Sequence, residues 1–88
     1  MTYVGTADSD EALAGQATRG KREAFEQLVR RYAAPILAFC QHLVQNAAEA
    51  EDRTQEAFTK AYQKISQFDP SGKFASWLFK IAQNCCID

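Results

Sequence analysis

The chain has 88 residues and a net charge of −1, with 47% hydrophobic and 24% charged residues. A chain of this length holds one domain around one hydrophobic core. Its sequence contains no apolar run of about 18 residues, so we expect no membrane insertion. A free-standing binder of duplex DNA is usually strongly basic, and this charge argues against that class. The first residues lack a signal-peptide pattern, so the expected location is cytoplasmic.

The first part of the chain predicts a loose start followed by a short helix. We expect a flexible N-terminal arm over residues 1–9 and a single helical domain over residues 10–88. Ser9 is a favourable N-cap, and the two acidic residues that follow it suit the first turn of a helix. Gly20 is expected to end this helix. It carries few apolar residues, which makes it the weakest of the four predicted helices.

A long amphipathic helix is predicted over residues 21–45. Its apolar residues recur every three or four positions, as on one face of a helix. They are Phe25, Leu28, Val29, Tyr32, Ile36, Phe39, Cys40 and Leu43, with Arg30, Arg31, Gln41 and Gln45 opposite. Pro35 lies inside this segment, and a proline removes a backbone donor and clashes with the preceding turn. Because the apolar pattern continues across Pro35, we expect one kinked helix rather than two.

The next segment, from Asn46 to residue 65 or 67, predicts a helix with two different faces. Asn46 is a suitable N-cap, and Glu49 stands where a reciprocal capping residue would. One face is apolar and suits the core: Ala50, Thr54, Ala57, Phe58, Ala61 and Ile65. The opposite face is acidic and amide-bearing: Glu49, Asp52, Gln55, Glu56, Thr59 and Gln63. The pattern alone leaves this outer face open to two interpretations, ordinary solvated surface or a binding surface.

A loop over residues 66–73 is predicted by Pro70 and Gly72, which interrupt the helical pattern. Phe68 lies inside this polar loop, so it either fills the core or offers an aromatic face to a ligand. The final helix begins near Lys73, and its apolar arc comprises Phe74, Trp77, Leu78, Ile81, Ala82 and Cys85. Its other side carries Ser76, Phe79, Lys80, Gln83 and Asn84. With Lys73, three of these form a short basic and amide-bearing strip, Lys73, Ser76, Lys80 and Asn84, and Trp77 lies at its edge.

The expected fold class is therefore all-α, a compact bundle of three main helices plus a short N-terminal helix. The predicted core is Phe25, Leu28, Tyr32, Ile36, Phe58, Ile65, Trp77, Leu78 and Ile81. The aromatic, basic and amide side chains of the last loop and helix would suit single-stranded nucleic acid. On pattern alone, Phe74 and Trp77 fit the core better than a binding surface.

The residue chemistry favours binding over catalysis. The sequence has three cysteines, one histidine, no phosphate-binding glycine loop and none of the common hydrolase or zinc-protease motifs. We therefore expect no enzyme, no cofactor and no metal site. Cys85 and Cys86 are interpreted as two small, mostly buried side chains.

Two motifs, in order and at matching spacing, resemble a known family. The first is Ala50-Glu51-Asp52-x-x-Gln55-Glu56-x-Phe58, followed by Ala61-Tyr62 and Phe68. The second is Phe74-x-x-Trp77-Leu78-x-x-Ile81-Ala82-x-Asn84. Together with Ala24-Phe25-x-x-Leu28-x-x-Arg31-Tyr32, they resemble region 2 of bacterial sigma factors of the sigma-70 family, most closely the extracytoplasmic-function (ECF) type. The resemblance covers residues 10–88.

This resemblance implies a domain that docks on RNA polymerase, recognises and melts the −10 promoter element, and directs transcription initiation. A coiled coil of the largest polymerase subunit would contact Asp52, Gln55, Glu56 and Thr59. The non-template DNA strand, with one base flipped out, would contact Phe68, Asp69, Ser71, Lys73, Ser76, Trp77, Lys80 and Asn84. The polymerase would supply the affinity for DNA that the net charge does not. An anti-sigma factor is a further expected partner, because such control is common in this branch.

Two features depart from the family pattern. Arg53 stands where members usually carry an apolar residue, at the edge of the polymerase face, where it either adds or weakens a contact. The second helical domain (region 4), which would read the −35 element, is absent from this chain, and the abrupt end of the last helix predicts a domain of a longer protein.

Two alternatives stay open from the sequence. One is a sigma-like protein–protein adaptor without DNA recognition. The other is a helical metal or redox enzyme that uses the carboxylates or Cys85 and Cys86.

Overall fold

A computed structural model describes residues 8–87. They form the helices α1 (Asp10–Thr18), α2 (Arg22–Val44), α3 (Ala47–Lys64) and α4 (Phe74–Ile87). A short 3-10 helix, η2 (Ile65–Gln67), extends α3. No β-strand occurs between residues 8 and 87, and the predicted all-α class is confirmed. Residues 1–7 of the predicted arm lie outside the described part of the chain.

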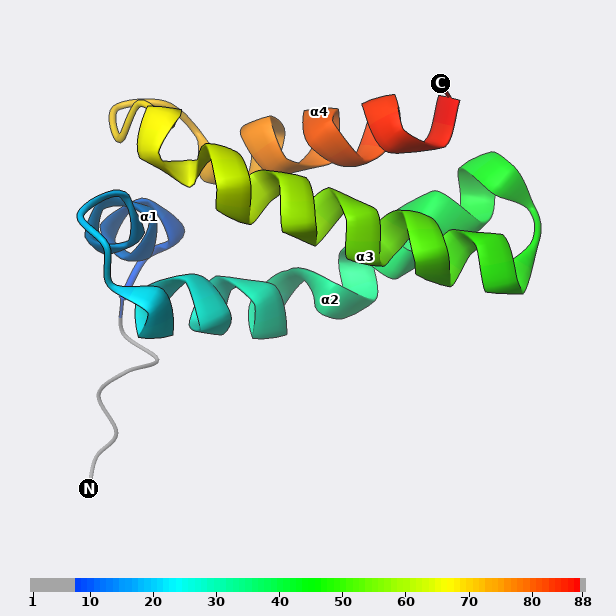
Figure 1. Ribbon diagram of the computed structural model, residues 1–88, viewed down its shortest axis with the longest axis horizontal. Helices are drawn as coiled ribbons and strands as arrows, with labels where there is room; N and C mark the ends of the chain where they lie inside the picture. Colours follow the sequence, from blue (N-terminus) through cyan, green and yellow to red (C-terminus); the bar gives the residue numbers. More distant parts are fainter. Residues whose placement is uncertain (1–7, 88) are drawn as a thin grey trace.

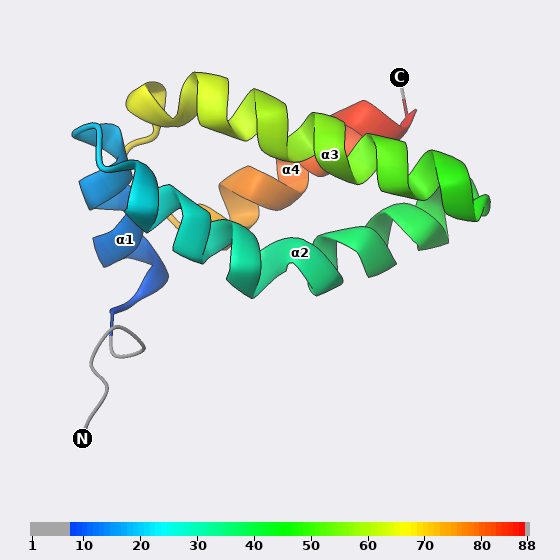
Figure 2. The same cartoon turned by 60° about the horizontal axis from the view of Figure 1, so that its bottom comes forward.

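The helices form a bundle in which α2 and α3 run along the length of the molecule and α4 packs against both (Figure 1). α1 lies at one end, where it contacts α2, η2 and α4 (Figures 1 and 2). The loop between η2 and α4 lies at this same end. The arrangement therefore brings the first helix of the chain next to the start of the last one.

The predicted ends of α1 are confirmed. Ser9 Oγ accepts a hydrogen bond from the backbone N–H of Ala12 at 3.0 Å, which satisfies one of the unpaired amides of the first turn. Gly20 follows the helix with φ at 96°, a left-handed conformation that glycine adopts without a steric penalty. Leu13 and Ala14 are fully buried, so packing against other helices holds this short helix in place.

Polar contacts also attach α1 to α2. Arg31 Nη1 lies 2.9 Å from Asp10 Oδ1, and Arg31 Nη2 donates a hydrogen bond to the backbone oxygen of Asp8 at 2.6 Å. The Tyr32 hydroxyl donates to the other carboxylate oxygen of Asp10. Burial, together with the bond to Asp10, raises the pKa of Tyr32 to about 12. Arg31, expected on the outer side of its helix, is half-buried in this contact.

α2 is a single helix of 23 residues, about 34 Å long at 1.5 Å per residue. Pro35 lies within it on the exposed side, and Figure 2 shows the helix bending near its middle, as the sequence predicts. Leu43 belongs to the apolar face predicted for this helix, but it is 36% exposed. The reason is that the turn joining α2 to α3 extends past the end of α4 (Figure 1).

The start of α3 has half of the predicted capping arrangement. Asn46 Oδ1 accepts a hydrogen bond from the backbone N–H of Glu49 at 2.8 Å. The Glu49 carboxylate instead lies 3.5 Å from Arg53 Nη2, one helical turn further on, where an opposite charge attracts it. The alanines of the apolar face, Ala50, Ala57 and Ala61, are fully buried.

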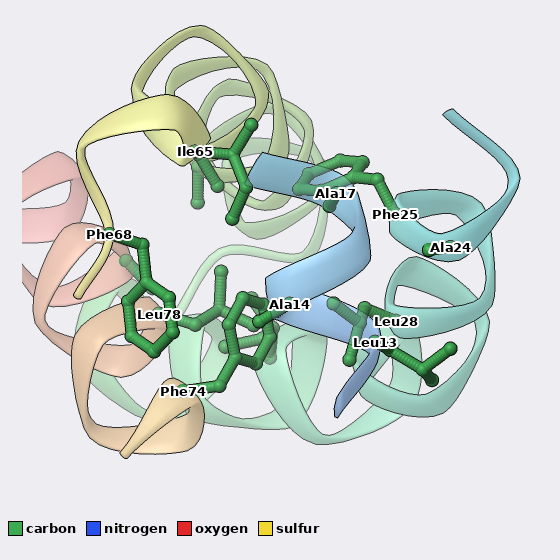
Figure 3. Close-up of a cluster of buried hydrophobic side chains, with 14 of the residues drawn as sticks. Leu13, Ala14, Ala17, Ala24, Phe25, Leu28, Ile65, Phe68, Phe74 and Leu78 are labelled. Carbon is green, nitrogen blue, oxygen red and sulfur yellow. The ribbon is translucent and has the colours of Figure 1, made fainter. Parts of the chain in front are cut away.

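The core is a continuous cluster of side chains from all four helices and the loop (Figure 3). Its largest fully buried members are Phe74, Leu13, Leu28, Ile36, Leu78 and Cys40. Four residues predicted in the core are only half-buried and pack at its margin: Tyr32, Phe58, Trp77 and Ile81. Phe79, expected on the polar side of α4, packs its ring 5.2 Å from Phe39, because α2 extends under this side of α4.

Candidate functional site

The acidic face of α3, defined as Asp52, Gln55, Glu56 and Thr59, forms one open surface. Three of these side chains are exposed and Glu56 is half-buried. Residues three and four positions apart lie on the same side of a helix, which brings the four together. The buried alanines on the opposite side pack toward α2 and α4 and so fix the direction in which the acidic face points.

Arg53 pairs with two acidic residues at the edge of this face. Its Nη1 lies 3.0 Å from Glu56 Oε1, and its Nη2 lies 3.5 Å from Glu49 Oε2. Lys60 Nζ lies 3.3 Å from the other carboxylate oxygen of Glu56. Hydrogen bonds from Lys60 and Arg53 lower the pKa of Glu56 below its usual value. Glu56 is therefore paired within its own helix, whereas Asp52 is exposed.

The polar strip of α4, defined as Lys73, Ser76, Lys80 and Asn84, is exposed along its whole length. Its members are three or four positions apart, so they share one side of the helix. Trp77 lies half-buried at the border of the strip. Two cations, a hydroxyl and an amide thus form a row beside an indole ring, which is chemistry that suits the phosphates and bases of a single strand.

The loop before α4 is held in a tight turn by Asp69. Asp69 Oδ1 accepts hydrogen bonds from the Ser71 backbone N–H at 3.0 Å and from the Ser71 hydroxyl at 2.8 Å. These bonds from Ser71 lower the pKa of Asp69. The backbone N–H of Gly72 also donates to the Asp69 carbonyl at 2.8 Å, and a Cβ at Gly72 would lie only 3.3 Å from that oxygen. The loop is therefore ordered by its own side chains.

Phe68 is the one predicted DNA-contacting residue that the structure buries. It is 5% exposed, and its ring centre lies 5.8 Å from that of Phe74 and 5.3 Å from that of Trp77. Of the two interpretations left open by the sequence, this position corresponds to the core. The three rings fasten the loop to the start of α4, so Phe68 shapes the surface on which the polar strip lies.

An open groove between α2 and α3 was missed at the sequence level. It encloses about 440 Å³ and is lined by Arg22, Phe25, Glu26, Val29, Phe58, Thr59, Tyr62 and Gln63. Tyr62 is 46% exposed and its ring centre lies 5.1 Å from that of Phe25. The sequence signal for this groove was Tyr62, an aromatic residue that adjoins Gln63 on the outer side of α3. Periodicity does not report the spacing between two helices, on which a groove depends.

The cysteines are free thiols in or near the core. Cys40 and Cys85 are buried and Cys86 is half-buried. Burial and a hydrogen bond with Cys40 raise the pKa of Cys86 to about 12, and burial raises that of Cys85. A raised pKa disfavours the reactive thiolate.

Within residues 8–87, no three His, Cys, Asp or Glu side chains gather as a metal site. No helix there combines the length and apolar character needed to cross a bilayer.

Comparison with known proteins matches this architecture to a family. The family model described as Sigma-70 region 2 matches residues 28–88. The chain is 42% identical over 73 residues to the ECF RNA polymerase sigma factor SigW of Bacillus subtilis (strain 168), which covers 83% of this chain and 39% of that protein. It is 39% identical over 79 residues to the RNA polymerase sigma-H factor of Pseudomonas aeruginosa, which covers 90% of this chain and 41% of that protein. The chain thus spans about two fifths of the length of these relatives.

Two solved structures share the fold. One is an NMR structure of an engineered region 2 of sigmaE in complex with GTAAAA, with a TM-score of 0.86 and 32% identity over 94% of this chain and 86% of that one. The other is CnrH in complex with the cytosolic domain of CnrY, with a TM-score of 0.84 and 33% identity over 90% of this chain and 51% of that one. The chain therefore belongs to the sigma-70 region 2 family, within its extracytoplasmic-function branch.

Proposed function

We propose that this chain is the part of an ECF sigma factor that binds core RNA polymerase and captures the −10 promoter element during transcription initiation. The observation that supports this most is its likeness, over 94% of the chain, to a region 2 that was solved with GTAAAA. The two exposed surfaces of the chain, one acidic and one polar with an aromatic border, fit two different partners.

The acidic face of α3 is the proposed dock for a coiled coil of the largest polymerase subunit. Asp52 is exposed and would meet a basic side chain, while Gln55 and Thr59 supply hydrogen-bonding groups beside it. Thr59 also lines the groove between α2 and α3. A partner helix that lies along α3 would therefore contact both the face and the groove.

The polar strip and the loop are the proposed site for the non-template strand. Lys73 and Lys80 would neutralise phosphates, Trp77 would stack on a base, and the amide of Asn84 and the hydroxyl of Ser76 would bond to base or sugar. Flipping a base out of the stack costs a few kcal/mol, which a pocket selective for the extruded base offsets. Asp69 and Ser71 lie in the loop that would receive this base.

With a net charge of −1, the chain needs the polymerase to supply most of the attraction to DNA. In this proposal the polymerase performs the chemistry, so the chain itself is not an enzyme. The proposed location of the chain is the cytoplasm. CnrH was solved with the cytosolic domain of CnrY, and we propose that an anti-sigma partner of that kind controls this chain too.

The test separates the two surfaces. Asp52→Arg is expected to weaken binding to core polymerase by about tenfold or more, because it reverses an exposed interface charge, while the unfolding midpoint stays unchanged. Glu23→Arg, at an exposed acid in the first turn of α2, is the charge-matched control. Unchanged affinity of the Asp52 variant would contradict the docking surface.

Lys80→Ala and Asn84→Ala are expected to reduce open-complex formation more than binding to core polymerase. Equal losses in both measurements would contradict a DNA role for the polar strip. If the unaltered chain binds core polymerase but the resulting complex retains no −10 non-template oligonucleotide, the adaptor alternative explains the chain better.

A further inference from the structure

The helix that carries the polar strip begins without a capping residue of its own. Its first residue is Phe74, and the hydrogen bond from the Trp77 N–H to the Lys73 carbonyl, at 3.2 Å, places Lys73 at the cap position. Lysine has no acceptor atom, unlike the Ser, Thr, Asp and Asn side chains that cap helices. The first amides of a helix have no partner within the helix. The first amides of α4 therefore depend on water or on an acceptor from elsewhere in the molecule.

Glu11 of α1 provides that acceptor. Its Oε2 accepts a hydrogen bond from the Phe74 backbone N–H at 2.9 Å. This bond joins two residues that are 63 positions apart in the sequence. A carboxylate is well suited to this place, because the N-terminus of a helix carries partial positive charge. Glu11 is half-buried and Phe74 is 1% exposed, so the bond lies partly shielded from water.

The support from which Glu11 projects is itself fixed. Leu13, two residues further along α1, is fully buried. Asp10, the residue before Glu11, pairs with Arg31 of α2 at 2.9 Å. Glu11 therefore links the start of α4 to the α1–α2 unit, and its carboxylate reaches Phe74 from a defined position.

We propose that Glu11 is a positioning residue for strand capture, and this inference rests on the proposed function of the polar strip. Lys73, the first cation of the strip, adjoins the bonded amide. The Phe74 ring contacts Phe68 of the loop, with ring centres 5.8 Å apart. Displacement of the Phe74 backbone would therefore move the first cation of the strip and the base-receiving loop together. Glu11 acts through Phe74 and needs no contact with DNA.

The experiment compares Glu11→Ala with Glu11→Gln in the whole chain. Hydrogen exchange of the Phe74 amide is measured by NMR, and capture of a random-sequence single-stranded DNA pool is measured for the complex with core polymerase. In Glu11→Ala we expect Phe74 exchange about tenfold faster and strand capture about fivefold weaker, the size of effect that a lost helix cap produces. Core polymerase binding should stay unchanged. Glu11→Gln keeps an acceptor oxygen and should restore most of both properties.

Two control variants distinguish loss of the Glu11 bond from other causes of faster Phe74 exchange or weaker strand capture. Glu23→Ala removes an exposed first-turn acid from α2 and should change neither property. Lys80→Ala should weaken capture while Phe74 exchange stays as in the unaltered chain. If Glu11→Ala accelerates exchange throughout α3 as well, it unfolds the domain, and Glu11→Gln then decides the question.

Unchanged Phe74 exchange in Glu11→Ala would overturn the inference, and so would faster exchange with undiminished capture. If the unaltered complex captures no single-stranded DNA, the proposed function fails and takes the strand-capture role of Glu11 with it. In that case Phe74 exchange still reports whether Glu11 anchors α4, so the two failures are distinguishable.

Discussion

The acidic face of α3 and the polar strip of α4 are both rows of exposed side chains on a helix, yet they are held differently. The ion pairs at the acidic face join residues three and four apart, such as Arg53 with Glu56. The polar strip depends on distant segments: Glu11 of α1 bonds to the start of α4, and Phe68 of the loop packs against it. Changes at the acidic face should therefore alter binding with little effect on folding, whereas changes around the start of α4 should alter both.

The largest effect is expected from Phe68→Ala. The ring is 5% exposed and contacts Phe74 and Trp77, so its removal leaves a cavity beneath the loop. The free energy of unfolding should fall by about 3 kcal/mol, measured by urea denaturation followed by circular dichroism, and strand capture should fall with it. Phe68→Leu keeps most of the volume and should cost about 1.5 kcal/mol or less. Nearly unchanged stability with lost capture would instead place the ring on the DNA side.

Tyr32→Phe tests a contact that joins α1, α2 and α4. The variant keeps the ring against Phe74 but loses the hydroxyl bond to Asp10. Because that bond is to a charged group, stability at neutral pH should fall by about 1–2 kcal/mol, measured by the same denaturation.

The pH dependence of this contact has a definite sign. The pKa of Tyr32 is raised from 10.0 to about 12, so its contribution is complete below pH 10 and is lost as the pH rises from 10 to 12. The unaltered chain should lose stability in that window more steeply than Tyr32→Phe. Parallel pH profiles would show that burial and the bond to Asp10 do not raise the pKa of Tyr32 in the folded chain.

A smaller effect, confined to the loop, is expected at Asp69. Asp69→Ala removes both bonds to Ser71, whereas Asp69→Asn keeps an oxygen that accepts them. The alanine variant should weaken strand capture about threefold by loosening the turn, and the asparagine variant should stay close to the unaltered chain. The lowered pKa of Asp69 means that its contribution is present above pH 3.8 and is lost as the pH falls below that value. Equal effects of both variants would assign the role to the charge rather than to the turn.

The smallest effect on folding is expected from Arg53→Leu, at the edge of the acidic face of α3. Its ion pairs are exposed and within one helix, so the unfolding midpoint should hardly change. Without the guanidinium, Glu49 loses this partner and Glu56 keeps its ion pair with Lys60. The surface becomes more negative, so binding to core polymerase should strengthen about twofold to fivefold at low salt, with the gain declining as salt screens the charges. Weaker binding by the variant would show that Arg53 itself contacts the polymerase.

Local interactions account for what the sequence predicted of this site. The acidic face and the polar strip follow from residues three and four apart, so periodicity placed Asp52 beside Glu56 and Lys80 beside Asn84. Whether each surface binds its partner did not follow from periodicity. The pairing of Arg53 with Glu49 and Glu56 required the structure, because several neighbouring charges compete for the same guanidinium.

By itself, the sequence determined the four helices, their caps at Ser9 and Asn46, and the bend at Pro35. These depend on contacts within about one turn of the chain. Only the tertiary structure decided that Leu43 is exposed, that Phe79 packs on α2 and that Glu11 caps α4. Each of these depends on where one helix lies relative to another, which is set by how the side chains of all four helices fill one core.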